Sequence, residues 1–293
     1  SVSNTMNLSA ELMLQLSIVI PLLSSLVIIA AGHYPNLREG ITITTCLILI
    51  YLVFNLYQGL SLGETISVFW WEILPGLAVS FDIEPLGMLF ALIASFLWLV
   101  TTCYSIGYMR SHHEKNQTRF YSCFAVTIGA VIGLAFAANL FTLFIFYEVL
   151  TLTTYPLVTH AGTEKALKGG RTYLGILLGT STVFFLLAII STWLVAGTLD
   201  FKLGGIFAAD VDKVFAGILL ILFIFGISKA AIMPFHRWLP AAMVAPTPVS
   251  ALLHAVAIVK AGVFTILKMC VYIFGLDLLS VLPTTQFLLY LAG

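Results

Sequence analysis

Long apolar runs separated by short polar stretches make up most of the chain. A bilayer core of about 30 Å requires about 20 predominantly apolar residues per helix. Runs of that length predict eight complete membrane-spanning helices and the start of a ninth near residue 281. Because lipid does not tolerate unpaired backbone groups, each span is expected to be helical. The predicted limits are 12–31, 41–60, 85–109, 119–137, 139–160, 172–197, 213–234 and 248–276.

Prolines interrupt this pattern after Lys229. Four of them, Pro234, Pro240, Pro246 and Pro248, follow within a short distance. Proline removes a backbone donor and clashes with the preceding turn, so the pattern predicts a discontinuous helix near 229–247. Broken backbone at membrane depth commonly lines an ion path. The alternative is an ordinary loop at the inner boundary of the membrane.

The basic residues between the spans predict an orientation. Loops rich in Lys and Arg stay on the cytoplasmic side. An N-terminus on the outside places most basic residues inside and most acidic loop residues outside. The basic residues predicted inside are Arg38, Arg110, Lys115, Arg119, Lys165, Lys168, Arg171 and Arg237, against Lys202 and Lys213 outside.

The composition supports a lipid environment and excludes several functions. Of the 293 residues, 60% are hydrophobic and 9% are charged, whereas about 25% of a soluble domain is charged. The net charge is zero, so nothing indicates nucleic-acid binding. The cysteines show no ligand or disulfide spacing, and we expect neither a metal nor a cofactor. Gly175 and Gly179 form a G-x-x-x-G motif, which predicts close helix packing. The cysteines are Cys46, Cys103, Cys123 and Cys270.

Glu148 is the acidic residue predicted near the middle of a span. Burying a charge at the bilayer centre costs at least about 2.5–3.5 kcal/mol, so such residues usually mark transport paths. Thr151, Tyr155 and Thr159 follow at positions that share one helical face with Glu148. This polar stripe is typical of a hydroxyl-lined path to the inner side. The alternative is a structural ion pair.

Three lysines also lie within predicted spans. Lys229 precedes the proline-rich break, and Lys260 lies near mid-membrane. Both are candidates for proton transfer, with an interfacial position as the alternative for Lys229. His254 can relay protons because its ordinary pKa is near neutrality, or it can be a satisfied packing residue. Lys268 lies nearer the outer end and is expected to extend to the interface.

The residues around these charges resemble a known family. Glu148 in FYEVL, Lys229 in ISKAAIMPFH and the segment PFHRWLPAAMVAPTPVSALLHAVAIVKAGVF are similar to the antiporter-type subunits shared by Mrp Na+/H+ antiporters and respiratory complex I. The D subunit of Mrp is the nearest by these motifs, and subunits L, M and N of complex I are similar. The resemblance implies that Glu148, Lys229, Lys260 and His254 form a proton relay.

The resemblance also implies an architecture. The fold is expected to be an all-α polytopic membrane bundle with inverted repeats, each containing one discontinuous helix. Residues 1–116 would supply three N-terminal helices, and residues 117–276 the first five-helix repeat, which forms a proton half-channel. Residues 277–293 would begin the next helix. The chain is expected to be truncated before the second repeat and to lack the titratable residue of that repeat.

The function implied is proton translocation in cation/proton antiport, in a bacterial inner membrane. The expected partners are other hydrophobic subunits, the lipid bilayer and protons, and whether Na+ also passes is open. The alternative is a proton-pumping subunit of an NADH:quinone oxidoreductase or a membrane-bound hydrogenase. Redox chemistry would then belong to other subunits, so whether the chain is part of an enzyme is open. A membrane scaffold would leave the central charges unexplained.

Overall fold

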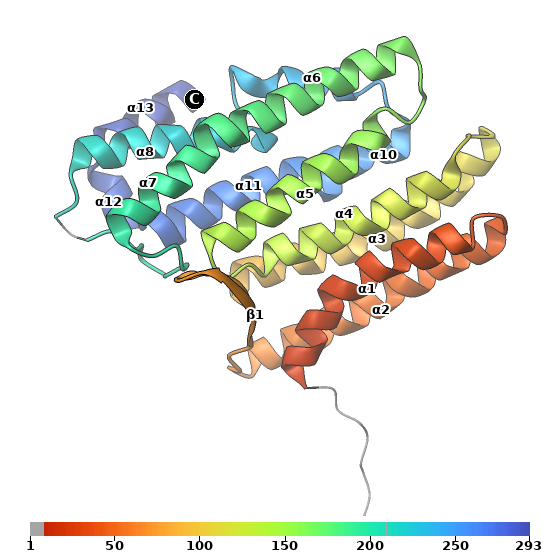
Figure 1. The fold of residues 1–293 in the computed structure, drawn as a ribbon, viewed down its shortest axis with the longest axis horizontal. Coiled ribbons are helices and arrows are strands. Elements are labelled where there is room, and N and C mark those ends of the chain that lie inside the picture. Colours follow the sequence, from red (N-terminus) through yellow and green to blue (C-terminus); the bar gives the residue numbers. More distant parts are fainter. Residues whose placement is uncertain (1–8, 209) are drawn as a thin grey trace, which may run out of the picture.

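The apolar runs form helices that lie side by side and run in alternating directions through the bundle (Figure 1). A computed structural model describes residues 9–208 and 210–293. The helices are α1 (Ala10–Ala30), α2 (Pro35–Ser61), α3 (Pro85–Ser111), α4 (Gln117–Ala135), α5 (Leu140–Val158), α6 (Glu164–Thr180), α7 (Leu186–Ala196), α8 (Lys213–Gly226), α9 (Trp238–Ala242), α10 (Thr247–Ala251), α11 (Ile258–Lys268), α12 (Leu276–Val281) and α13 (Pro283–Ala292).

Seven helical stretches of the described residues are long and apolar enough to cross a membrane. Two of them contain π-helical turns: Glu164–Ala196 joins α6 and α7, and Thr247–Phe274 joins α10 and α11. Lys213–Gly226 is a shorter apolar helix. The predicted fold class, a polytopic helical membrane bundle, is therefore confirmed.

Local sequence explains where several helices begin. The Asn139 side chain accepts a hydrogen bond of 2.7 Å from the Thr142 amide at the start of α5. Thr163 caps α6 and Asp212 caps α8 in the same way. Proline occupies the first turn of α2, α3, α10 and α13, where its missing donor has no helical partner to lose.

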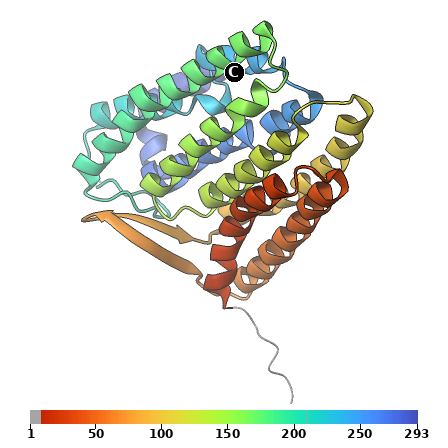
Figure 2. The ribbon, with the colours of Figure 1, turned by 45° about the vertical axis from the view of Figure 1, so that its right-hand side comes forward.

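A two-stranded antiparallel hairpin was not predicted. Strand β1 (Ser67–Leu74) pairs with β2 (Leu77–Asp82) and projects across one end of the bundle (Figure 2). The sequence analysis treated this segment as an outer loop. The hairpin is anchored to the helices because Asn139 donates to the Ala78 carbonyl at 2.8 Å. We call this end of the bundle the hairpin end and the opposite end the far end.

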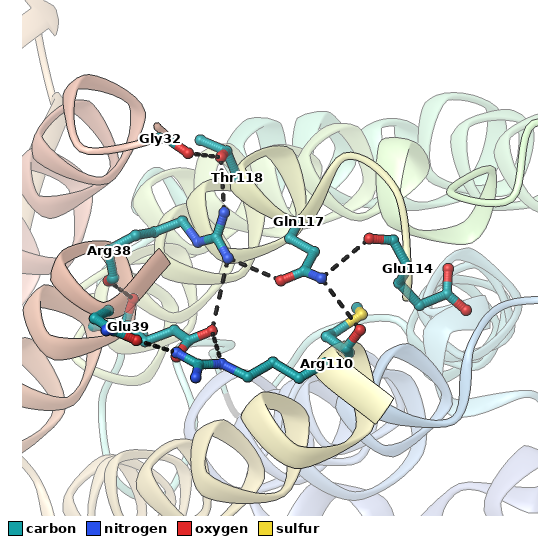
Figure 3. Close-up of polar contacts among 10 residues, drawn as sticks. Gly32, Arg38, Glu39, Arg110, Glu114, Gln117 and Thr118 are labelled. Carbon is teal, nitrogen blue, oxygen red and sulfur yellow. Dashed lines mark hydrogen bonds and ion pairs between the residues drawn. The ribbon is translucent and has the colours of Figure 1, made fainter. Parts of the chain in front are cut away.

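Buried charges join the helices at the far end (Figure 3). Arg38 and Glu39 lie near the start of α2 and are each 4% exposed. Glu39 pairs with Arg38 at 3.7 Å and also with Arg110, which is in the last turn of α3. Arg38 donates to Gln117 at 2.8 Å and to Thr118 at 3.1 Å, both at the start of α4. We call these residues the Arg38 cluster, and they fix α2, α3 and α4 to one another.

The discontinuous helix lies where the prolines predict it. Helix α8 ends at Gly226, and the 3-10 turns η2 (Ser228–Ala230) and η3 (Phe235–Arg237) follow before α9. Gly226 is required at this point, because a Cβ there would overlap the backbone of Phe185 in the π-helical turn η1 (Ser181–Phe185). The break is therefore packed against other helices, in contrast to the ordinary boundary loop that was the alternative.

The packing predicted for the G-x-x-x-G motif is wrong within the described chain. No described atom lies within 4 Å of a Cβ built at Gly175 or Gly179. The close contacts of α6 are instead made by Gly169 and Gly170, whose pair suggested a turn in the sequence but which lie inside the helix. Gly169 packs against the Ala241 carbonyl, and Gly170 packs against Thr159.

Candidate functional site

Lys229 lies in the helix break with its side chain completely buried. Its Nζ donates to the Thr151 hydroxyl of α5 at 2.5 Å. The same Nζ lies 3.4 Å from the centroid of the Tyr147 ring, so the π face provides a second favourable contact for the ammonium. The backbone amide of Lys229 also lies 3.4 Å from the Tyr147 hydroxyl. Two side chains of α5 thus hold this lysine inside the bundle.

Glu148 lies on α5 between these two side chains, one residue after Tyr147 and one turn before Thr151. Its Oε1 is buried and has no hydrogen-bond partner among the described residues. Glu148 also forms no ion pair with any described cation. Tyr147, its neighbour in the chain, contacts the Lys229 ammonium. The structure thus brings the two residues together as neighbours without direct contact.

Helix α11 closes the other side of the break. A Cβ at Gly262 would overlap the backbone of Lys229 and Ala230, so only glycine allows α11 to approach this closely. Trp238 of α9 donates through its ring nitrogen to the Ser228 carbonyl at 2.9 Å. The Ser228 and Thr180 hydroxyls are 2.6 Å apart. The 3-10 turn that carries Lys229 is therefore fixed from three helices.

His254 and Lys260 lie on the helix that packs against the break. His254 is partly exposed in the π-helical turn η4 (Leu252–Val256), and its Nε2 is buried with no partner among the described residues. Lys260 is close to the middle of the Thr247–Phe274 stretch, the depth that the sequence analysis expected. Its side chain is exposed on the described chain, not held against Lys229. His254 and Lys260 therefore lie on one continuous helical stretch. Neither is hydrogen-bonded or ion-paired to Glu148 or Lys229 among the described residues.

Two profile matches decide the family. Residues 137–292, more than half of the chain, match the family described as NADH:quinone oxidoreductase/Mrp antiporter, transmembrane region. The chain belongs to this family. Residues 73–121 also match the N-terminal region of complex I chain 5. The stretch 137–292 includes Glu148, Lys229, His254 and Lys260, so all four candidate residues lie in the part that defines this antiporter-type family.

Curated relatives carry names from both branches of the family. NAD(P)H-quinone oxidoreductase subunit 5 of Ipomoea purpurea chloroplasts is 27% identical over 272 residues, covering 88% of this chain and 37% of its own length. Na(+)/H(+) antiporter subunit A1 of Staphylococcus aureus is 28% identical over 277 residues, covering 88% of this chain and 32% of its own length. The chain therefore spans about a third of these relatives. Their names are subunit A1 and subunit 5, whereas the sequence motifs pointed to the D subunit of Mrp.

Solved structures share the antiporter-type fold. A chain of the archaeal membrane-bound sulfane sulfur reductase superposes with a TM-score of 0.78 at 21% identity, covering 95% of this chain and 56% of that one. A chain of the Mrp complex from Dietzia sp. DQ12-45-1b gives 0.74 at 24% identity, covering 94% and 29%. At these identities the likeness establishes the fold of the bundle.

The position predicted for Lys268 is wrong. The sequence analysis expected this lysine to extend to the membrane interface, but its side chain is 2% exposed and forms an ion pair with Glu84, the residue before α3. Its Nζ lies 4.5 Å from the centroid of the Phe201 ring and 4.6 Å from that of Tyr272. Glu84 was assigned to a loop 184 residues earlier, so periodicity within one helix could not reveal this partner.

A second titratable residue that sequence reasoning missed lies beyond the far end of α5. The side chain of His160 is 1% exposed, and its Nε2 is 3.7 Å from a carboxylate oxygen of Glu114. Burial lowers the pKa of His160, the Arg119 guanidinium lowers it further, and the Glu114 carboxylate opposes both. His160 directly follows the polar stripe of Glu148, Thr151, Tyr155 and Thr159 in the sequence. That position could have indicated it as a titratable residue at the end of the stripe.

Proposed function

We propose that this chain is a proton-translocating subunit of a multisubunit cation/proton antiporter of the Mrp type. The observation that supports this most directly is Lys229, which is completely buried at a helix break and held against the helix that carries Glu148. A buried ammonium is costly unless neighbouring groups compensate it. A lysine balanced in this way can gain or release a proton when the neighbouring charge changes.

The proposed relay contains Glu148, Lys229, His254 and Lys260. Glu148 adjusts the proton affinity of Lys229 electrostatically, and the proton then moves towards Lys260 along α11. Gly262 keeps α11 close to the break, which supports transfer between the two elements. Residues 117–276 would form the first repeat and its half-channel. The expected orientation places the hairpin end outside and the far end inside the cell membrane.

Lys260 requires a covering element in this proposal. An exposed lysine at mid-span faces hydrocarbon, at a cost of about 2.5–3.5 kcal/mol or more. A polar or acidic side chain from a neighbouring segment or subunit would remove that cost and provide the next position for the proton. The relay on this chain is thus one part of a longer path, in agreement with the greater length of its relatives.

The test measures antiport in everted membrane vesicles that contain the intact complex. Glu148→Gln and Lys229→Met should each reduce the Na+-driven change in the transmembrane pH gradient at least about tenfold, with membrane insertion unchanged. Glu164→Gln and Lys213→Met make the same chemical changes at exposed positions and should retain wild-type activity. Wild-type transport by both Glu148→Gln and Lys229→Met would refute the relay.

The second candidate is a proton-pumping subunit of a redox-driven complex. The name of the chloroplast relative, a quinone oxidoreductase subunit, favours it. Among the described residues, no group of three or more His, Cys, Asp or Glu side chains could hold a metal ion, so redox centres of that kind would belong to partner subunits. Purification of the native complex distinguishes the candidates: iron–sulfur subunits and NADH-driven proton movement support the redox type. Hydrophobic antiporter subunits with Na+-dependent exchange support the Mrp type, and the composition of the complex also tests the assignment to its D subunit.

A further inference from the structure

A second charged site lies at the hairpin end, apart from the Glu148–Lys229 pair. A cavity of about 290 Å³ opens there between β2, the start of α3 and the end of α11. The titratable groups that line it are Asp82 of β2, Glu84 before α3, Lys268 of α11 and Tyr272 of the π-helical turn η5 (Met269–Phe274). The rest of the lining consists of apolar side chains, including Phe201 and Leu203 of the loop before α8.

The three charged groups are graded from the interior to the surface. The Lys268 side chain is 2% exposed, Glu84 is 13% exposed, and Asp82 is exposed at the mouth of the cavity. Lys268 contacts Glu84 directly and has aromatic rings on two sides. Desolvation raises the pKa of Asp82, and the charge of Lys268 opposes this effect, so Asp82 senses the charge of the lysine. The buried amine, the partly buried Glu84 carboxylate and the exposed Asp82 carboxylate thus line one cavity.

This site is also connected to the relay by a helix. Lys268 lies eight residues after Lys260 on α11, a separation of about 12 Å along the axis at 1.5 Å per residue. A purely structural ion pair would need neither the cavity nor the second carboxylate at its mouth. Buried ion pairs contribute little net stability compared with apolar packing, so stability alone is a weak reason for this arrangement.

We infer that Lys268, Glu84 and Asp82 form a proton-exchange site that connects the α11 helix with the aqueous phase at the hairpin end. In the forward step the Lys268 ammonium gives a proton to the Glu84 carboxylate, leaving a neutral amine and a neutral acid. Glu84 then gives the proton to water at the mouth, where the Asp82 carboxylate stabilises the hydronium ion. The reverse steps load Lys268. The inference rests on the proposed function for its transport readout.

Lys268→Arg separates exchange from structure. Arginine keeps the positive charge and the pairing with Glu84 but is not deprotonated in proteins. In the intact complex this variant should lose at least about tenfold in transport and lose the dependence of the rate on the pH at the hairpin side, with an unchanged thermal midpoint. Lys202→Arg, at an exposed position of the same face, is the matched control. Wild-type transport and pH dependence in Lys268→Arg would assign the pair a structural role and overturn the inference.

A second measurement does not depend on transport. In a background without the native cysteines, Lys268→Cys should react with a membrane-impermeant methanethiosulfonate reagent added at the hairpin side. Thr265→Cys, one turn earlier on α11 and 1% exposed in the native chain, should not react. An unreactive Cys at position 268 would overturn the inference. If Glu148→Gln and Lys229→Met transport normally, the proposed function fails, and the labelling still decides whether water reaches Lys268.

Discussion

The Arg38 cluster allows a quantitative prediction. Glu39→Gln removes the carboxylate that pairs with Arg38 and Arg110 but preserves the shape of the side chain. Breaking a fully buried ion pair typically costs about 3–5 kcal/mol, because the remaining charge stays buried. Two features reduce this figure: Arg110 is 48% exposed, and Arg38 keeps its hydrogen bonds to Gln117 and Thr118. We expect a loss of about 2–3 kcal/mol.

The assay is thermal unfolding of the purified protein in mild detergent, followed by tryptophan fluorescence. The expected loss corresponds to a decrease of about 3–5 °C in the midpoint for a chain of this size. Glu114→Gln is the matched control at the same end, because the Glu114 side chain is 27% exposed and its one ion pair among the described residues is with His160, at 3.7 Å. It should cost less than about 1 kcal/mol.

A double variant tests the reasoning itself. If the penalty comes from an uncompensated buried charge, then Arg38→Met in addition to Glu39→Gln should recover part of the lost stability. A double variant less stable than Glu39→Gln alone would show that the hydrogen bonds of Arg38 stabilise the far end more than its charge destabilises it. Equal midpoints for Glu39→Gln and Glu114→Gln would refute the assigned role of burial.

Three further predictions concern the site and its surroundings. Thr151→Val removes the hydroxyl that accepts a hydrogen bond from Lys229. Because hydrogen bonds to charged groups contribute about 1.5–3 kcal/mol, this variant should reduce transport about tenfold or more without loss of membrane insertion. Antiport in vesicles measures the change. Gly262→Ala should abolish transport because its Cβ meets the Lys229 backbone, whereas Gly179→Ala, with no described atom within 4 Å of its Cβ, should be neutral. Burial lowers the pKa of His160 below its value in the unfolded chain, about 6.5. As the pH falls, the unfolded state therefore binds the proton before the folded state does. The free energy of unfolding should then decrease below about pH 6.5. His160→Gln should weaken that pH dependence, as measured by thermal midpoints across this range; an unchanged slope would contradict the assignment.

The helical bundle was predictable because membrane spanning leaves a strong signal in sequence. Apolar length alone located several spans to within a few residues, as 12–31 against Ala10–Ala30 and 248–276 against Thr247–Phe274 show. The span predicted at 172–197 begins eight residues earlier, at Glu164, and the span predicted at 213–234 ends eight residues earlier, at Gly226. Proline chemistry located the break, and the start of α13 at Pro283 lies close to the expected residue 281. In each case the determining interaction is local, or is an interaction with lipid, and does not depend on a distant partner.

Features that depend on distant partners were not predictable in this way. The Lys268–Glu84 pair joins helices far apart in sequence, so Lys268 alone resembled an interfacial lysine. The burial of Glu39 was not predicted, because its ion-pair partner Arg110 lies on a different helix. The hairpin had a local signal, the turn residues Pro75-Gly76, but the sequence analysis treated this segment as a loop between two spans. The roles of Glu148, Lys229, His254 and Lys260 stay predictions.

The π-helical turn η4 determines which way the end of its helix faces. A turn closed by bonds between residues five apart contains one residue more than an α-helical turn. Every side chain after Val256 is therefore rotated by roughly 100° compared with an uninterrupted α-helix. After this turn, Gly262 faces the break and Lys260 is exposed. Interconversion of this single turn with an α-helical turn would therefore reorient both residues together.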